Sequence, residues 1–188
     1  MKIKKSFFIV IIFVIIFIIL GLVFLFKNKT NFKSENQISE FTPQAEMSED
    51  DLRKTIICLY FKNIETNSLI AEARCIDVKN LYENPYSYLV NLIISGPENE
   101  KLESPIPEGT KINACYIEGN TVIVDLSKEF VDNTPSGIEE ESMAVYSIVN
   151  TLTELNEVSN VKILINGEEN KSFKDGKINF KNLFFKND

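Results

Sequence analysis

The feature that most constrains this chain is a long uncharged run near its N-terminus. Residues 6–26 (SFFIVIIFVIIFIILGLVFLF) carry no charged side chain over 21 positions. A helix of about 20 apolar residues is long enough to span the hydrocarbon core of a bilayer. The sequence therefore predicts a transmembrane helix over 6–26, with 1–5 as a short tail.

Two other membrane signals fit this run less well. A secretory signal has an apolar region of about 7–15 residues that ends in a small-residue cleavage site, whereas this run is longer and continues into KNKT at 27–30. A lipid anchor needs a cysteine directly after the run, but the three cysteines, Cys58, Cys75 and Cys115, lie far downstream. We expect a single-pass protein of the cell membrane with a cytoplasmic N-terminus and an extracytoplasmic domain, because long domains translocate largely regardless of charge.

The charged residues are distributed unevenly on the two sides of this N-terminal region. Six of its 20 basic residues and none of its 27 acidic residues lie in 1–33, which leaves 14 against 27 and a formal charge of −13 for the remainder. Nucleic-acid binding requires a concentrated basic surface that neutralises phosphates. The composition therefore argues against nucleic acid and anionic wall polymers as partners.

The polar segment 27–54 lacks periodicity and is expected to be a flexible linker. The folded domain is predicted over 55–170, and 171–188 is treated as a C-terminal extension. Strands are expected at 55–61 and 68–77, joined by a polar turn, and a helix at 86–94 that ends at Gly96 and Pro97. The following proline-rich stretch, 97–110, is expected to be a rigid connector.

The second half of the domain contains the clearest hairpin, at 111–127. Gly119 and Asn120 suit its two-residue type II′ turn, and alternation assigns Cys115, Ile117, Val122, Val124 and Leu126 to the core face. A helix with capping-box spacing at 136–139 follows and continues to Leu155. A strand at 161–165 and a weaker one near 177–180 complete the prediction.

This order of elements predicts an α+β fold in which both helices pack on one face of a mixed β-sheet. The two halves each read strand, strand, helix, but their sequences are too dissimilar to establish a repeat.

No catalytic, metal or cofactor site is predicted. The chain contains no histidine, which excludes Ser-His-Asp and Cys-His arrangements. The acidic triplet 139–141 suits the first turn of a helix, where the dipole favours negative charge. Cys58 and Cys75 lie opposite each other if the first hairpin is symmetric about residues 66 and 67, so a disulfide and free thiols both remain open.

An ordered set of short motifs runs through the domain. They are LIISGP at 92–97, IPEGT at 106–110, VDLS at 124–127 with Phe130, VNTLTEL at 149–155 and VKILING at 161–167. In this order the motifs resemble a GerMN domain, the sporulation and spore germination domain of the GerM family. The residues that match motif positions, all with folding roles, are Gly96, Pro97, Pro107, Gly109, Asp125, Ser127 and Phe130.

The resemblance implies a small module similar to the ring-building domains of sporulation machinery, with protein partners in the envelope or the intermembrane space. It implies no enzyme and no cofactor. Its best model is assembly of a homo- or hetero-oligomeric complex between mother cell and forespore. The chain departs from lipid-anchored, two-domain members in its transmembrane span and its single domain. A small-ligand sensor that uses the 97–110 loop, and a wall enzyme with paired carboxylates, are the alternatives.

Overall fold

The computed structural model describes residues 53–174 and 176–187, all within one compact unit, Met47–Asp188. The predicted transmembrane segment 6–26 and nearly all of the linker 27–54 lie outside these residues. Within the described part of the chain, no helix is both long and apolar enough to cross a bilayer.

The strands form two sheets. The first has the order β2-β1-β3 and consists of β1 (Lys54–Asn63), β2 (Leu69–Asp77) and the short β3 (Leu102–Glu103), paired antiparallel. The second has the order β4-β5-β6, with β4 (Ile112–Glu118) antiparallel and β6 (Asn160–Ile165) parallel to the central β5 (Thr121–Leu126). The α+β class is confirmed, but the prediction of one mixed sheet is wrong.

The reason for two sheets lies at the edge of β1 that faces α4 (Ile138–Leu152). The Tyr60 amide donates to the Thr151 hydroxyl at 3.0 Å, and the Ser147 hydroxyl donates to the Tyr60 carbonyl at 2.6 Å. Helix side chains thus satisfy the backbone groups that a further strand would otherwise pair with. The first sheet ends against α4 at this point.

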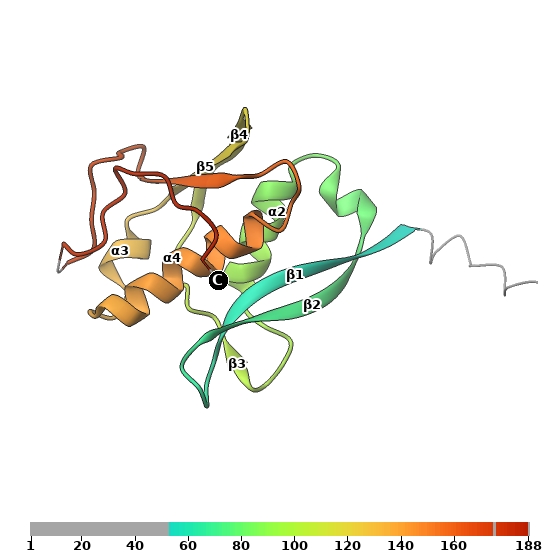
Figure 1. Ribbon diagram of the computed structural model, residues 1–188, viewed down its shortest axis with the longest axis horizontal. Helices are drawn as coiled ribbons and strands as arrows, with labels where there is room; N and C mark the ends of the chain where they lie inside the picture. Colours follow the sequence, from blue (N-terminus) through green and yellow to red (C-terminus); the bar gives the residue numbers. More distant parts are fainter. Residues whose placement is uncertain (1–52, 175, 188) are drawn as a thin grey trace, which may run out of the picture. The chain divides into compact units, whose positions relative to one another are not determined.

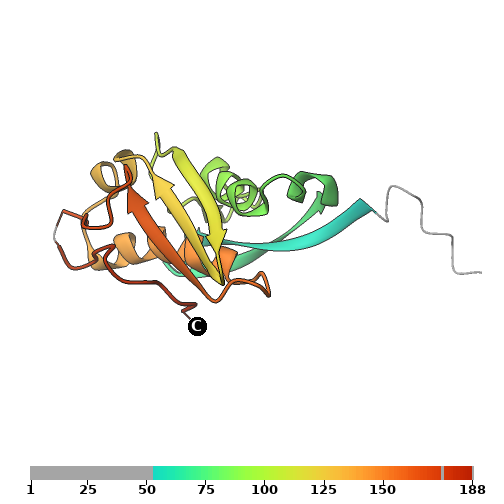
Figure 2. The same cartoon turned by 90° about the horizontal axis from the view of Figure 1, so that it is seen from above.

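The two main helices, α2 (Pro85–Ser95) and α4, lie between the sheets, as the two views show together (Figures 1 and 2). At the start of α2, the Asn84 side chain accepts from the Ser87 amide at 2.9 Å, and Pro85 occupies the first turn. The helix ends at Gly96, whose φ of 93° favours glycine. The predicted helix and its stop are confirmed.

The start of α4 differs from the prediction. Its N-cap is Gly137, with φ 143° and no side-chain hydrogen bond, so the predicted capping by Ser136 is wrong. Glu139, Glu140 and Glu141 do occupy the first turn. The helix ends at Leu152, three residues earlier than expected, and its apolar face is buried.

Two short helical segments were not predicted. A 3₁₀ turn, η2 (Val78–Leu81), follows β2, and α3 (Glu129–Asp132) follows β5. In the second hairpin Gly119 has a φ of 63° while Asn120 is absent from the positive-φ residues, as a type II′ turn requires. Cys115 and the valines of β5 are buried as expected.

The C-terminal segment packs onto the core of the second sheet. Phe173 and Phe180 are buried against Phe130, with ring centroids 5.6 Å and 6.3 Å from it. Phe184 then pairs with Val161 of β6 through two backbone hydrogen bonds of 2.8 Å. The extension 171–188 therefore contributes to the folded domain. The weak strand expected near 177–180 is reduced to a single bridge between Ser172 and Asn179.

The register of the first hairpin overturns the symmetric pairing of the cysteines. Cys58 lies opposite Ala73, and Cys75 lies opposite Ile56, so the two cysteines are diagonal neighbours with free thiols. The turn is centred on Glu65 and Thr66, because the Asn63 side chain accepts from both of their amides at 2.9 Å. The third cysteine, Cys115, is buried, and burial raises its pKa to about 12.

Candidate functional site

Five of the seven motif residues gather at one end of the second sheet. Asp125 accepts from the Gly167 amide at 2.8 Å and joins the end of β5 to the turn after β6. Ser127 exchanges bonds with Lys111: its hydroxyl accepts from the Lys111 amide at 3.0 Å, and its own amide donates to the Lys111 carbonyl at 2.9 Å. Phe130 fills the aromatic core below.

The other two residues of this group, Pro107 and Gly109, form a tight turn beside α3. The Thr110 amide donates to the Pro107 carbonyl at 3.3 Å, and Gly109 has a φ of 87°, as the third position of a type II turn requires. The Asn133 side chain donates to the Glu108 carbonyl at 2.9 Å and holds the turn against α3. These motif residues therefore fix loops rather than present reactive groups.

Gly96 and Pro97 lie apart from this group, beneath the first hairpin. The Arg74 guanidinium donates to the Gly96 carbonyl at 3.2 Å and forms an ion pair with Glu72. Glu72 also accepts from the amides of Glu98 and Asn99. Burial by itself raises the pKa of Glu72, but the hydrogen bonds from Arg74 and from these amides outweigh it, so the pKa is lowered.

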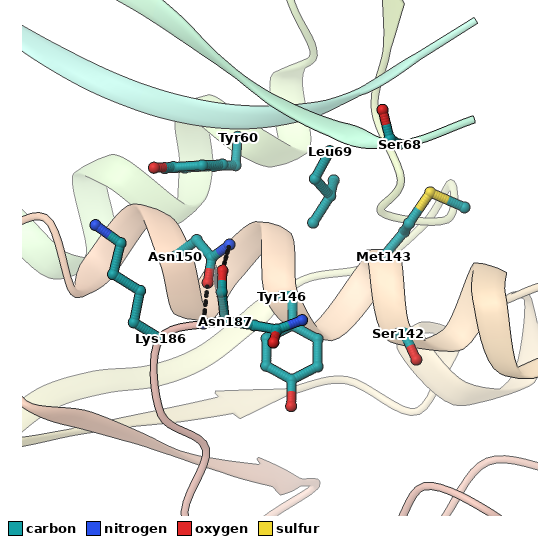
Figure 3. Close-up of a pocket in the computed structure, with 9 residues that line it drawn as sticks. All are labelled: Tyr60, Ser68, Leu69, Ser142, Met143, Tyr146, Asn150, Lys186 and Asn187. Atoms are coloured by element: carbon teal, nitrogen blue, oxygen red, sulfur yellow. Dashed lines mark hydrogen bonds between the residues drawn. The ribbon is translucent and has the colours of Figure 1, made fainter. Parts of the chain in front are cut away.

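A surface groove borders α4 and provides the strongest candidate for a binding site (Figure 3). Its volume is about 480 Å³. Its walls come from the hairpin, from α4 and from the C-terminal segment. The lining residues are Tyr60, Ser68, Leu69, Ser142, Met143, Tyr146, Asn150, Lys186 and Asn187.

The C-terminal wall of the groove is pinned by a paired amide contact. The Asn150 side chain donates to the Asn187 carbonyl at 3.0 Å and accepts from the Asn187 amide at 3.1 Å (Figure 3). Next to it, Lys186 forms an ion pair with Glu154 at 2.7 Å. The Asn150 side chain thus pairs with the Asn187 backbone in the way that the backbone of a neighbouring strand would.

Tyr60 closes the hairpin side of the groove. Its hydroxyl donates to Glu154 at 2.8 Å. Burial, followed by this hydrogen bond, raises the pKa of Tyr60, while hydrogen bonds from Lys186 and Tyr60 lower the pKa of Glu154. At neutral pH the groove therefore presents a neutral phenol beside an ionised carboxylate.

A second hollow, of about 730 Å³, lies where the proline-rich loop meets α4. Lys62 sits in it between Glu140 and Glu103, at 3.0 Å and 3.1 Å. Burial alone lowers the pKa of Lys62, but the bonds to both carboxylates outweigh this and raise it. Pro105 and Pro107 form the opposite wall, so part of the 97–110 connector does line a surface hollow.

Neither hollow is lined by cysteine or histidine. In the described residues no three His, Cys, Asp or Glu side chains lie close enough to hold a metal ion. The groove combines aromatic, thioether, hydroxyl and amide groups, which suit recognition of a protein segment. Sequence reasoning did not select these residues because they come from three distant parts of the chain. The sequence signal that could have indicated the groove is the outward position of Tyr60, an aromatic residue, in its strand.

The fold is that of an α+β module of the GerMN type, as comparison with solved structures shows. The tandem GerMN domains of the sporulation protein GerM from Bacillus subtilis match with a TM-score of 0.60 and 19% identity, covering 77% of this chain and 50% of that one. The first GerMN domain of the same protein gives 0.55 and 23%, covering 66% and 92%. A putative lipoprotein from Clostridium perfringens gives 0.50 and 22%, covering 74% and 92%.

The family follows from the sequence itself. Residues 58–171 match the family model Germane, described as sporulation and spore germination. The chain belongs to this family. It spans half the length of the tandem-domain structure. No curated protein matches it.

Proposed function

We propose that this protein is a noncatalytic, membrane-anchored module that acts outside the cytoplasmic membrane in sporulation or spore germination by assembling with other proteins. The observation that carries the proposal is the groove along α4. Its walls offer Tyr60, Tyr146 and Met143 together with the Asn150 amide, a combination that suits contact with a polypeptide. Family membership supplies the process, and the uncharged run 6–26 supplies the anchor.

The proposed process is tested by counting heat-resistant spores of a deletion strain of the host. The strain is complemented with the full chain and, in parallel, with a version that lacks residues 6–26. We expect the full chain to restore the count and the unanchored version to fail. Unchanged counts in the deletion strain, together with normal germination of its spores, would contradict the proposed process.

The proposed groove is tested in the same strain by a matched pair of substitutions. Ser142→Arg fills the groove from α4, whereas Ser136→Arg places the same side chain at an exposed position before the helix. We expect only Ser142→Arg to lower the spore count, at equal protein levels. Equal counts for the two variants would exclude the groove as the contact surface.

The hollow beside the proline-rich loop supports a second candidate, a small-ligand sensor in germination. Its Lys62 lies between two carboxylates and could meet a zwitterionic ligand such as an amino acid. Equilibrium dialysis of the full chain in detergent against labelled amino acids tests this. Saturable binding that Lys62→Met removes would favour the sensor, and no saturable binding would eliminate it.

A further inference from the structure

The first sheet has an open edge along β2. β2 pairs with β1 on one side, and within the described residues no strand pairs with its other side. The Tyr60 backbone points away from β2, because it bonds to α4, and Tyr60 lies opposite Ala71. Tyr60 and Ala71 are therefore a non-hydrogen-bonded pair. In an antiparallel ladder the backbone amides and carbonyls of both members of such a pair point away from each other. The backbone groups of Ala71 therefore face the open edge, and by alternation so do those of residues 69, 73, 75 and 77.

This edge lacks lysine, proline and a β-bulge, three of the devices that prevent another strand from adding, and its inward-pointing charges, Glu72 and Arg74, pair with each other. Lysine, proline and β-bulges commonly block pairing at sheet edges. The sequence of β2, LIAEARCID, contains neither lysine nor proline, and its register with β1 is continuous over nine pairs. A groove of about 470 Å³ also borders the edge, between residues 70–73 and the loop with Glu98 and Asn99.

We propose that β2 pairs antiparallel with β2 of a second copy of this chain, about a two-fold axis at Ala73. This inference rests on the proposed assembly function and names one of its partners. In this register Ala73 faces Ala73, Ala71 faces Cys75, and Leu69 faces Asp77 of the second copy. All of these residues have outward-facing backbone groups, so each opposed pair exchanges two hydrogen bonds.

The side chains on the inner face of the sheet select this register. Glu72 of one copy faces Arg74 of the other, and Ile70 faces Ile76, so charges and apolar groups both match. A register centred on Glu72 or on Arg74 places like charges opposite each other. A register centred on Ala71 or on Cys75 places a charged residue opposite isoleucine. Among these five registers only the one centred on Ala73 is complementary on the inner face of the sheet.

The first hairpin extends beyond α4. β1 and β2 run past the end of α4 in both views (Figures 1 and 2). Antiparallel pairing therefore carries the two α4 helices toward opposite ends of a six-stranded sheet with the order β3-β1-β2-β2-β1-β3. Such an interface is closed, because the same surface of each copy is used once. The groove runs along α4, and Ser68 and Leu69 form part of its hairpin wall, so the pairing of Leu69 with Asp77 borders one end of the groove.

Cysteine cross-linking of the full chain in detergent tests the register. Cys58 and Cys75 are first replaced by serine, while buried Cys115 is kept. Each variant is treated with copper phenanthroline and separated on a non-reducing gel. We expect Ala73→Cys to form a covalent dimer, because this position faces itself across the axis. Tyr82→Cys, whose side chain is 77% exposed after η2, serves as the control and stays monomeric.

The opposed pair formed by residues 71 and 75 gives a sharper test. Ala71→Cys cross-links when native Cys75 is retained and loses the cross-link when Cys75 is serine. The proposal is overturned if Ala73→Cys forms no dimer, if Tyr82→Cys dimerises equally, or if Ala71→Cys cross-links without Cys75. Spore counts are independent of this test, so the pairing and the proposed function fail separately.

A second pair of variants changes β2 without changing β1, and only one of the two is expected to prevent the pairing. Ala73→Pro deletes an amide that faces the open edge, whereas Ala73→Ser keeps it. By sedimentation we expect the protein mass to halve for Ala73→Pro and to stay dimeric for Ala73→Ser. An Ala73→Pro chain with unchanged circular dichroism and a dimeric mass would overturn the proposal. If the circular dichroism of Ala73→Pro changes, the substitution has disturbed the fold, and the cross-linking results alone then decide whether β2 pairs with β2.

Discussion

The two sheets of this domain are stabilised in different ways. In the second sheet, four of the six residues of β5 are buried, because helices cover one face and the C-terminal segment packs on the same sheet. In the first sheet, only two of the nine residues of β2 are buried. Along β5 stability therefore depends mainly on apolar burial. In the first sheet, β1 also buries Leu59 and Phe61, whereas β2 depends more on hydrogen bonds and charges at defined positions.

The Phe130→Ala variant tests the apolar side of this comparison and has the largest expected effect. Phe130 is fully buried against Phe173 and Phe180, so its removal leaves a large cavity. We expect the free energy of unfolding to fall by about 4 kcal/mol. Urea denaturation of the full chain in detergent measures it. Phe185→Ala, at a side chain that is 60% exposed, is the matched control, and an equal loss there would contradict the comparison.

The Arg74→Ala variant tests the charged side. Arg74 is buried, and its loss leaves Glu72 without its ion-pair partner and the Gly96 carbonyl without a donor. We expect a loss of about 3 kcal/mol in the same denaturation experiment. Lys79→Ala removes an exposed partner of Asp77 and is expected to cost far less, because solvent screens an ion pair at the surface. If both variants lose equally little, the first sheet does not depend on this pair.

Thr151→Val tests the junction between α4 and β1. The substitution keeps the shape of the side chain but removes the acceptor of the Tyr60 amide. An unsatisfied buried amide costs about 1–3 kcal/mol, and we expect a loss near the middle of that range. Thr153→Val is the matched control, since that hydroxyl bonds only to carbonyls of its own helix. Equal losses would show that the edge of β1 does not need α4.

The acid dependence of Glu72 gives the smallest effect. Its pKa in the folded protein is lower than its ordinary value of 4.5. The stability it contributes is therefore complete well above pH 4.5 and is lost as the pH falls through the folded-state pKa. We expect Glu72→Gln to lower stability at pH 7 and to flatten the decline in stability as the pH falls below 4.5. Glu118→Gln, on the exposed end of β4, should leave that decline unchanged.

Local patterns in the sequence were sufficient to place most elements. Alternation located both hairpins, Gly96 ended α2, and Gly119 with Asn120 fixed the second turn. These features depend on neighbouring residues, whose spacing the sequence displays directly. The cap of α4 was misassigned because Ser136 had suitable spacing, yet Gly137 alone supplies the backbone conformation found there.

Sequence reasoning could not reach the groove residues. Tyr60, Met143 and Lys186 carry no shared motif, and they meet only because the hairpin, α4 and the C-terminal segment pack together. The register of Cys58 and Cys75 was missed for a related reason. A shift of one residue in the centre of the turn moves every cross-strand pair by two positions.

The sequence by itself determined the class of the fold, the family, most element positions and the acidic, histidine-free chemistry of the domain. These follow from local periodicity, ordered motifs and composition. Only the tertiary structure decided the division into two sheets, the groove beside α4 and the open edge of β2. Each of these depends on which distant segments satisfy one another's backbone groups, and no short-range pattern encodes that choice.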